Sequence, residues 1–265
     1  MFGRKTLKEI ATTLGVSFPT LQKAFDKLNF PQGLLHPIPS NPINLIIDAT
    51  FFGREYGYLC FHDTEHIIWF KEIKTENVAE LREGLYALKK AGYSFKSVTI
   101  DGRTGYYNNI KKVLGPVPIQ MCLYHQKALV RRYITDRPKT LCGQELKSLM
   151  ALLCTLPTEE FIERFYLLKE KHKAFLNQKN INRSFKHQKL RAAFRSLDTN
   201  LAYLFTYRDI ASATIPSTIN YLEGMFAHLK EKVKIHRGLN QQRKKKSGCL
   251  LPFLLVISTP FFNYA

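Results

Sequence analysis

The sequence predicts a mixed α/β fold in which a β-sheet is followed by a mainly helical segment. Short apolar runs rich in β-branched residues lie at 43–50, 96–100 and 117–120, which is the pattern of buried strands. Between the first two runs, residues 77–91 have helical periodicity and are followed by Gly92. Strand signals then fade, and long stretches of residues 123–210 are helical and basic in pattern. This order of elements is typical of an α/β domain with a helical addition.

The first 29 residues predict two short helices joined by a turn at Gly15, with Ser17 as the N-cap of the second helix. Such a pair is typical of a helix-turn-helix DNA-binding motif, and also of an ordinary helical hairpin. Residues 30–42 contain four prolines and one glycine, which indicates a linker. In the DNA-binding interpretation, the second helix offers Thr20, Gln22 and Lys23 to a groove of the duplex.

The remaining elements follow from local patterns. Residues 56–62 and 66–73 predict a hairpin, and 104–114 a helix. A later helix is predicted to begin at Pro216 with Ser217 as its cap, and its apolar positions step by three and four residues. In the basic segment, five aromatic residues have helical spacing, which favours the core over base stacking: Phe161, Phe165, Phe194, Tyr203 and Phe205.

Charge is unevenly distributed along the chain. The net charge is +19, of which residues 43–124 carry only +1 whereas residues 125–210 carry +9. Such an excess predicts a polyanionic partner, most simply nucleic acid, although charge alone does not separate DNA from RNA or an acidic membrane. No apolar run reaches the roughly 18 residues of a membrane span, and the five cysteines are too sparse for a secreted disulfide scaffold. We therefore expect a soluble, cytoplasmic protein.

Three carboxylates are candidates for metal chemistry. Asp48 and Asp101 each close an apolar strand-like run, and strand ends in α/β sheets are where ligand sites form. Two nearby carboxylates repel one another, and a divalent cation relieves that repulsion. Glu223, beside the apolar face of the later helix, is a candidate third ligand. Taken singly, each acid is equally well explained as a turn residue or a solvated helix charge.

Four segments together resemble bacterial insertion-sequence transposases of the DDE type, in the branch related to eukaryotic Mutator-like elements. They are IIDATFFG around Asp48, VTIDGRTG around Asp101, MCLYHQKALVRR around Cys122 and His125, and STINYLEGMFAHLKEKVKIHRGL around Glu223. The gaps of 53 and 122 residues between successive acids also match, and the long second gap fits a helical insertion within a ribonuclease-H-like fold.

The resemblance implies metal-dependent DNA strand cleavage and strand transfer at the ends of a mobile element. Asp48, Asp101 and Glu223 would be the catalytic residues and the ligands of two Mg²⁺ or Mn²⁺ ions. Cys122 and His125 match a Cys-x-x-His element, which we interpret as structural or as positioning the active-site loop. A contact of His125 with a DNA phosphate or with the attacking group and a packing role for both residues are equally good alternatives. The partners would be double-stranded DNA, namely terminal repeats and target, and other copies of the chain in a homo-oligomer associated with the nucleoid. Basic residues in the matching segments are further candidate DNA contacts: Arg131, Arg132, Lys230 and Arg237.

The implied organisation is a helix-turn-helix over 1–29, a linker over 30–42, a ribonuclease-H-like core of 43–122 with 211–240, a basic helical insertion over 123–210 and an atypical tail over 241–265. The tail changes composition abruptly after a basic run at 243–246, which suggests a shifted reading frame or an early stop, and brings the activity of this copy into question. The alternatives are an inactive transposase remnant or DNA-binding regulator, and a ribonuclease-H-like nuclease such as a junction resolvase. The helix around Glu223 and the long second gap favour a transposase over a resolvase.

Overall fold

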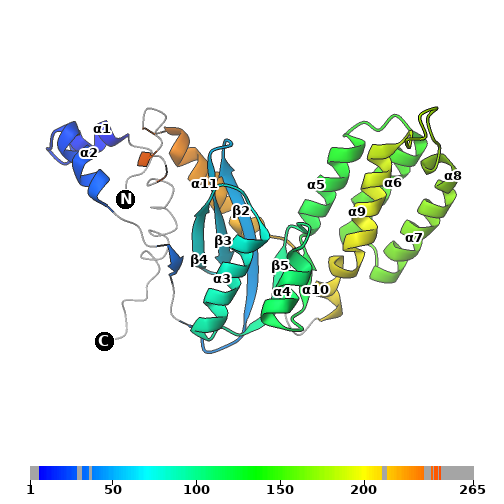
Figure 1. Ribbon diagram of the computed structural model, residues 1–265, viewed down its shortest axis with the longest axis horizontal. Helices are drawn as coiled ribbons and strands as arrows, with labels where there is room; N and C mark the ends of the chain where they lie inside the picture. Colours follow the sequence, from blue (N-terminus) through cyan, green and yellow to red (C-terminus); the bar gives the residue numbers. More distant parts are fainter. Residues whose placement is uncertain are drawn as a thin grey trace. The chain divides into compact units, whose positions relative to one another are not determined.

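The structure, a computed structural model, describes residues 6–28, 32–35, 38–210, 214–235, 240, 242–243 and 245, with the backbone alone at 221, 232 and 235. It confirms a mixed α/β architecture with a six-stranded sheet in the order β1-β4-β3-β2-β5-β6 (Figure 1). The strands are β1 Gly33–Leu34, β2 Ile43–Phe52, β3 Tyr56–His62, β4 Ile67–Ile73, β5 Phe95–Ile100 and β6 Ile119–Met121.

The chain divides into two compact units. The first contains the residues up to Phe95, the segment Asn108–Gly115 and the residues from Asn220 onward. The second contains Lys96–Tyr107 and Pro116–Ile219. Segments of the two units therefore alternate along the sequence. The mainly helical segment 123–210 belongs wholly to the second unit.

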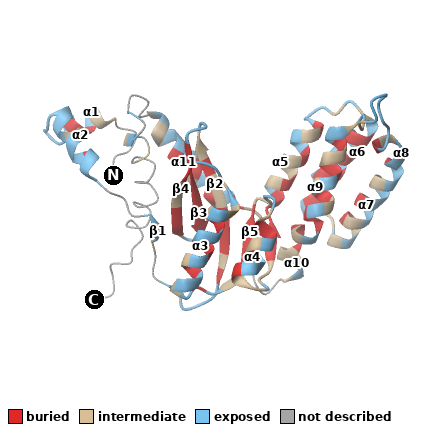
Figure 2. Ribbon diagram, viewed as in Figure 1, coloured by how far each residue is buried: buried red, intermediate tan, exposed pale blue. Residues whose placement is uncertain are grey.

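The antiparallel part of the sheet lies in the first unit. All seven residues of β3 are buried, so both of its faces are covered. The helix α3, Val78–Ala91, contacts β1, β3 and β4, and the helix α11, Asn220–Ile235, contacts β2. Asn77 caps α3 by accepting a hydrogen bond from the backbone of Glu80 at 3.0 Å, as its position before the apolar stripe indicates. Figure 2 shows that β3 and β4 consist largely of buried residues.

The predicted hairpin forms between β3 and β4. At its turn Thr64 has a left-handed φ of +82°, and its backbone N–H donates to Nδ1 of His62 at 2.9 Å. The Asp63 carboxylate accepts hydrogen bonds from the backbone of Glu65 and of His66. These side-chain acceptors satisfy turn N–H groups that the strands cannot pair, which fixes the register of the hairpin.

The N-terminal pair of helices is also present. The helices α1, Leu7–Thr13, and α2, Phe18–Lys27, contact one another. Thr6 and Glu9 form a capping box on α1, and Ser17 caps α2 by accepting from the backbone of Thr20 at 3.2 Å. The structure thus contains two short, well-capped helices at the predicted positions.

The second unit has a predominantly helical core. The helices α5 Leu123–Ile134 and α9 Gln188–Leu204 pack against one another. Phe161, Phe165, Phe194 and Phe205 are buried there, and Tyr203 stacks on Tyr107, so the prediction that these aromatics form core is confirmed. The other helices are α4 Tyr106–Leu114, which begins in this unit, α6 Leu141–Ala151, η1 Leu152–Cys154, α7 Thr158–Lys171, α8 Lys173–Leu176 and α10 Thr206–Asp209.

Two sequence predictions were wrong in detail. Asp48 does not close its strand: β2 continues to Phe52 because β3 pairs with it along residues 46–52. Ser217 does not cap α11, which begins at Asn220. The Ser217 carbonyl instead accepts from the backbone of Leu123, and the neighbouring Pro216 carbonyl accepts from the Thr99 hydroxyl. These tertiary hydrogen bonds therefore hold residues 216–217 outside the helix.

Candidate functional site

The loop after β5 places Asp101 at the predicted strand end. The Asp101 carboxylate accepts a hydrogen bond from the backbone of Arg103 at 3.0 Å, which folds the loop back on itself. Gly102 between them has φ of +82°, and a Cβ there would lie 2.2 Å from the Met121 sulfur. This position thus requires glycine both for its left-handed backbone and for its contact with β6.

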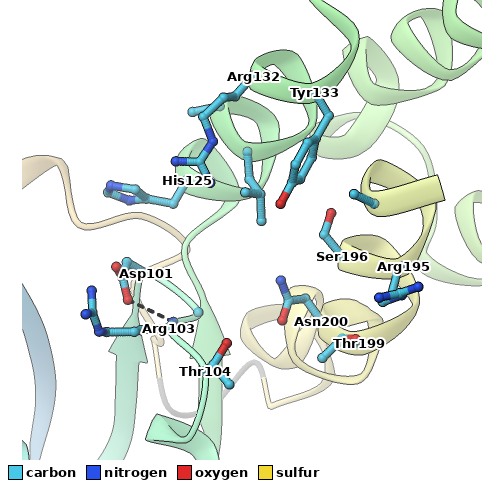
Figure 3. A pocket seen from close by; sticks show the side chains of 14 residues that line it. Asp101, Arg103, Thr104, His125, Arg132, Tyr133, Arg195, Ser196, Thr199 and Asn200 are labelled. Carbon is cyan, nitrogen blue, oxygen red and sulfur yellow. Dashed lines mark hydrogen bonds between the residues drawn. The ribbon is translucent and has the colours of Figure 1, made fainter. Parts of the chain in front are cut away.

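Asp101 lines a cavity of about 840 Å³ within the second unit (Figure 3). One wall is the loop from Asp101 to Thr104, and a second is the face of α5 that carries His125. The third wall is α9, which contributes Asn200 and Arg195. The cavity therefore depends on the packing of α5 against α9, helices separated by more than 50 residues in the sequence.

Positive charge dominates the cavity lining. Arg103, Arg132 and Arg195 come from its three different walls, whereas Asp101 is the acidic residue of the lining. Hydroxyl groups of Thr104, Tyr133, Ser196 and Thr199 add neutral hydrogen-bonding groups. A lining that contains three arginines and several hydroxyl groups is suited to binding a phosphate ester, because a guanidinium donates charge-assisted hydrogen bonds to phosphate oxygens.

A buried hydrogen-bond network supports the cavity from the α9 side. The Tyr107 hydroxyl donates to Oδ1 of Asn200 at 3.0 Å, and Nδ2 of Asn200 donates to Oε1 of Gln126 at 2.7 Å. Nε2 of Gln126 donates in turn to the Ser196 hydroxyl at 3.3 Å. Burial, and to a lesser extent the nearby Asp101 charge, raises the pKa of the Tyr107 phenol. Tyr107 thus stays protonated and serves as a hydrogen-bond donor.

Cys122 and His125 have different surroundings. Cys122 is the N-terminal flanking residue of α5, is fully buried, and its backbone N–H donates to the Ile100 carbonyl at 2.8 Å. Its position indicates a packing role that ties α5 to the end of β5. His125, one turn later, is half-buried and lines the cavity together with Asp101. Figure 3 shows its ring on the α5 wall, at the end of the cavity where Asp101 lies.

The other two candidate acids belong to the first unit. Asp48 lies in the middle of β2 opposite Cys60, and Glu223 lies in the first turn of α11. Both are half-buried. Because α11 contacts β2, these two acids come from neighbouring elements of one unit. Leu222 and Phe226, on either side of Glu223, are buried, as the apolar stripe of this helix predicts.

The chemistry of these three carboxylates fits Mg²⁺ or Mn²⁺, since both ions prefer oxygen ligands, and all three residues are half-buried. Over the described ranges, no three His, Cys, Asp or Glu side chains are grouped so as to hold a metal ion. Within the same ranges, no helix is long and apolar enough to cross a bilayer.

The candidate DNA contacts differ in accessibility. Thr20 and Lys23 are exposed on α2, although the Thr20 hydroxyl is hydrogen-bonded to that of Ser17 at 2.7 Å, and Gln22 is half-buried. Arg131, Arg132 and Lys230 are exposed, and Arg132 also lines the cavity. Arg237 lies outside the described residues.

Sequence reasoning did not identify several residues of the cavity. Arg103 lies within the quoted segment around Asp101, so its proximity to that acid was available as a signal. Arg195, Ser196, Thr199 and Asn200 carry no local signal, because only the packing of α9 against α5 brings them to Asp101.

Comparisons with known proteins give little further guidance. No protein-family model matches the chain, and no curated protein matches it. Among solved structures, the chain is similar to one in the cryo-EM structure of the simian T-cell lymphotropic virus intasome in complex with PP2A regulatory subunit B56 gamma, with 14% sequence identity and a TM-score of 0.25. That similarity covers 57% of this chain and 65% of the other. At this TM-score it does not identify a function.

Proposed function

We propose that the protein is a DDE-type transposase that cleaves DNA and transfers strands at the ends of its mobile element, in a metal-dependent reaction. The observation that carries the proposal is the cavity beside Asp101, where one carboxylate and His125 share a lining with three arginines. This lining suits a phosphodiester, the group on which such an enzyme acts. The strongly positive charge of the chain supports the same substrate.

In this proposal Asp48, Asp101 and Glu223 hold the divalent ions. Bound Mg²⁺ or Mn²⁺ supplies a Lewis acid that activates a water or a 3′-hydroxyl and stabilises the leaving oxygen during in-line displacement at phosphorus. Arg103, Arg132 and Arg195 bind the phosphate oxygens and orient the strand, and His125 donates a hydrogen bond to the same backbone. The α1–α2 pair serves as a helix-turn-helix that contacts the terminal repeats.

A plasmid assay tests the catalytic part of the proposal. The substrate is a supercoiled plasmid that carries the genomic DNA flanking the coding sequence on both sides, incubated with the full chain and Mg²⁺ or Mn²⁺. We expect nicked and linear products that EDTA prevents. Asp101→Asn should lower their formation by about a hundredfold or more, because it removes a metal ligand. Asp209→Asn, at an exposed acid of the same unit, should leave it unchanged. Absence of metal-dependent products from the wild-type chain would overturn the proposal.

A DNA-binding protein without catalysis is the second candidate function. It is supported by the net charge of +19 and by the exposed basic residues Arg131, Arg132 and Lys230, which a DNA-binding role needs without any catalytic metal. Binding and cleavage distinguish the two candidates. A chain that binds the flanking duplex with a steep salt dependence, but yields no cleavage above that of Asp101→Asn, is a binding protein only.

A further inference from the structure

Residues 178–186, between α8 and α9 of the second unit, form an ordered hairpin with a fully exposed isoleucine at its turn. An antiparallel bridge joins Lys179 to Phe185, and the backbone of Asn180 donates to the Ser184 carbonyl at 2.8 Å. Ile181, at the turn, is completely accessible to solvent. In Figure 1 this segment projects beyond the neighbouring helix ends of its unit, and Figure 2 colours it mostly as exposed.

Side-chain hydrogen bonds fix the conformation of this turn. Oδ1 of Asn182 accepts from both the backbone and the hydroxyl of Ser184, at 3.1 and 2.6 Å. Arg183 has a left-handed φ of +62°, and its backbone N–H donates to the Asn180 carbonyl at 2.9 Å. Because the turn is already ordered, insertion of Ile181 into a partner would cost little further conformational entropy.

The base of the hairpin is fastened to the helices on either side. The Arg191 guanidinium lies 3.5 Å from the centre of the Phe185 ring and donates to the Leu176 carbonyl at 3.1 Å. His187 stacks on Phe175 with ring centres 3.8 Å apart. The hairpin is therefore held in place against the helices on either side of it.

Basic residues lie on both sides of the exposed isoleucine along the chain. Residues 177–195 contain six basic residues and no acidic residue. Arg191 and Arg195 also line a cavity of about 300 Å³ together with Lys169, Lys173 and Asp198, in which Lys169 is ion-paired with Asp198. The six basic residues are Lys179, Arg183, Lys186, Lys189, Arg191 and Arg195.

The combination of one apolar tip and flanking cations favours duplex DNA as the partner. Proteins that kink DNA insert an aliphatic or aromatic side chain between base steps while basic groups bind the adjacent phosphates. An acidic membrane fits less well, because burial of one isoleucine contributes only about 1.5–3 kcal/mol and its neighbours Asn180 and Asn182 are polar.

We propose that hairpin 178–186 is a DNA wedge, in which Ile181 inserts between adjacent base pairs and the exposed hairpin cations Lys179, Arg183 and Lys186 bind the flanking phosphates. This inference deepens the proposed function, on which it rests, by naming the surface that deforms the DNA. A bent duplex contacts more protein surface than a straight one, which repays the cost of unstacking.

DNA bending by the full chain tests the wedge. The probe is a duplex of about 40 base pairs with central TA steps, which kink easily, and with a donor and an acceptor dye at its ends. The wild-type chain should raise energy transfer at saturation. Ile181→Ala should abolish that rise while the Kd changes less than about threefold, because phosphate contacts supply most of the affinity. Ile181→Leu, and Leu167→Ala at an exposed leucine of α7, should both bend the duplex as the wild type does.

The salt dependence of DNA binding tests the contribution of the basic residues of the hairpin separately. Arg183→Asn removes one cation but keeps a residue that tolerates a positive φ, so it should lower the slope of log K against log salt by about one and preserve bending. Normal bending by Ile181→Ala overturns the wedge. So does a result in which Ile181→Ala loses binding to phosphatidylserine vesicles but not bending of DNA.

The wedge and the proposed function fail in different ways. If the wild-type chain bends the duplex through Ile181 but cleaves no plasmid, the wedge is supported and transposase activity is not. If it cleaves the plasmid and Ile181→Ala bends the probe normally, the transposase proposal is supported and the wedge is overturned.

Discussion

One buried histidine in the first unit makes its stability depend on pH. His62 is 1% exposed at the end of β3, and burial lowers its pKa from 6.5 to about 4. Its Nδ1 atom accepts a hydrogen bond from Thr64, which requires that nitrogen to be unprotonated. The unfolded chain therefore binds more protons than the folded chain between these two pKa values, so the contribution is fully present above pH 6.5 and is lost as the pH falls toward 4.

We expect the His62→Gln variant to lose this pH dependence. Between pH 7 and pH 5 the free energy of unfolding of the wild type should fall by about 2 kcal/mol more than that of the variant, as the two pKa values require. Urea titrations at the two pH values measure the difference. His228→Gln, at an exposed histidine of α11, is the matched control and should behave as the wild type. Equal pH dependence in His62→Gln and wild type would contradict the assignment.

Only some of the individual cavity residues could be predicted from the sequence. Asp101 and His125 were identified from their segments, and both line the cavity. Arg195 was not, because helix α9 contains several basic residues and nothing in their spacing says which one faces Asp101. That choice depends on how α5 and α9 pack, which is set by contacts distant in the sequence.

At the scale of elements, the sequence patterns correctly predicted the positions of the strands and helices but not all of their ends. The predicted strands at 96–100 and 117–120 and the helix at 77–91 agree with β5, β6 and α3 to within two residues. Asp48 was misplaced at a strand end, because the length of β2 is decided by its partner β3 rather than by its own sequence. The start of α11 was misplaced for a similar reason, since the carbonyl groups of residues 216–217 are taken by other elements.

The close approach of α3 to the sheet depends on one glycine. A Cβ at Gly84 would lie 2.6 Å from the Phe61 ring, which is itself packed against Trp69. Gly84→Ala should therefore destabilise the protein by about 1–3 kcal/mol through overpacking, although alanine is the better helix former. Gly224→Ala in α11 meets nothing within 4 Å and should instead stabilise by about 0.5–1 kcal/mol. Chemical denaturation of both variants measures the contrast, and stabilisation by Gly84→Ala would contradict this packing.

At the scale of the whole molecule, the nearly neutral and the strongly basic parts of the chain form different structures. The nearly neutral segment 43–124 forms most of the sheet and supplies two of the three candidate ligands. The segment 125–210, with net charge +9, is mainly helical and contains Arg132 and Arg195 of the cavity as well as the basic residues of hairpin 178–186. Excess positive charge of this kind attracts a polyanion over long range. In the proposed function, the sheet region would supply carboxylates and the helical segment would supply phosphate contacts.

Metal binding by the three carboxylates predicts a change in the stability of the whole chain. An ion that binds only the folded state raises the free energy of unfolding by about 1.4 kcal/mol when its concentration is ten times its Kd. Thermal denaturation with and without Mg²⁺ or Mn²⁺ should therefore show a rise in Tm for the wild type. Glu223→Gln should abolish the rise, since it removes one ligand, and the same holds for Asp48→Asn.

The control for this measurement is on the same helix as the ligand. Glu231→Gln removes an exposed carboxylate two turns beyond Glu223 and should keep the full metal-dependent rise in Tm. If Glu231→Gln and Glu223→Gln lower the metal-dependent rise in Tm equally, the ion binds diffusely to surface acids. A specific site distinguishes between carboxylates by their position, whereas general screening depends only on their number. Only the first pattern, loss at residue 223 with retention at residue 231, agrees with a catalytic metal site built from residues far apart in the sequence.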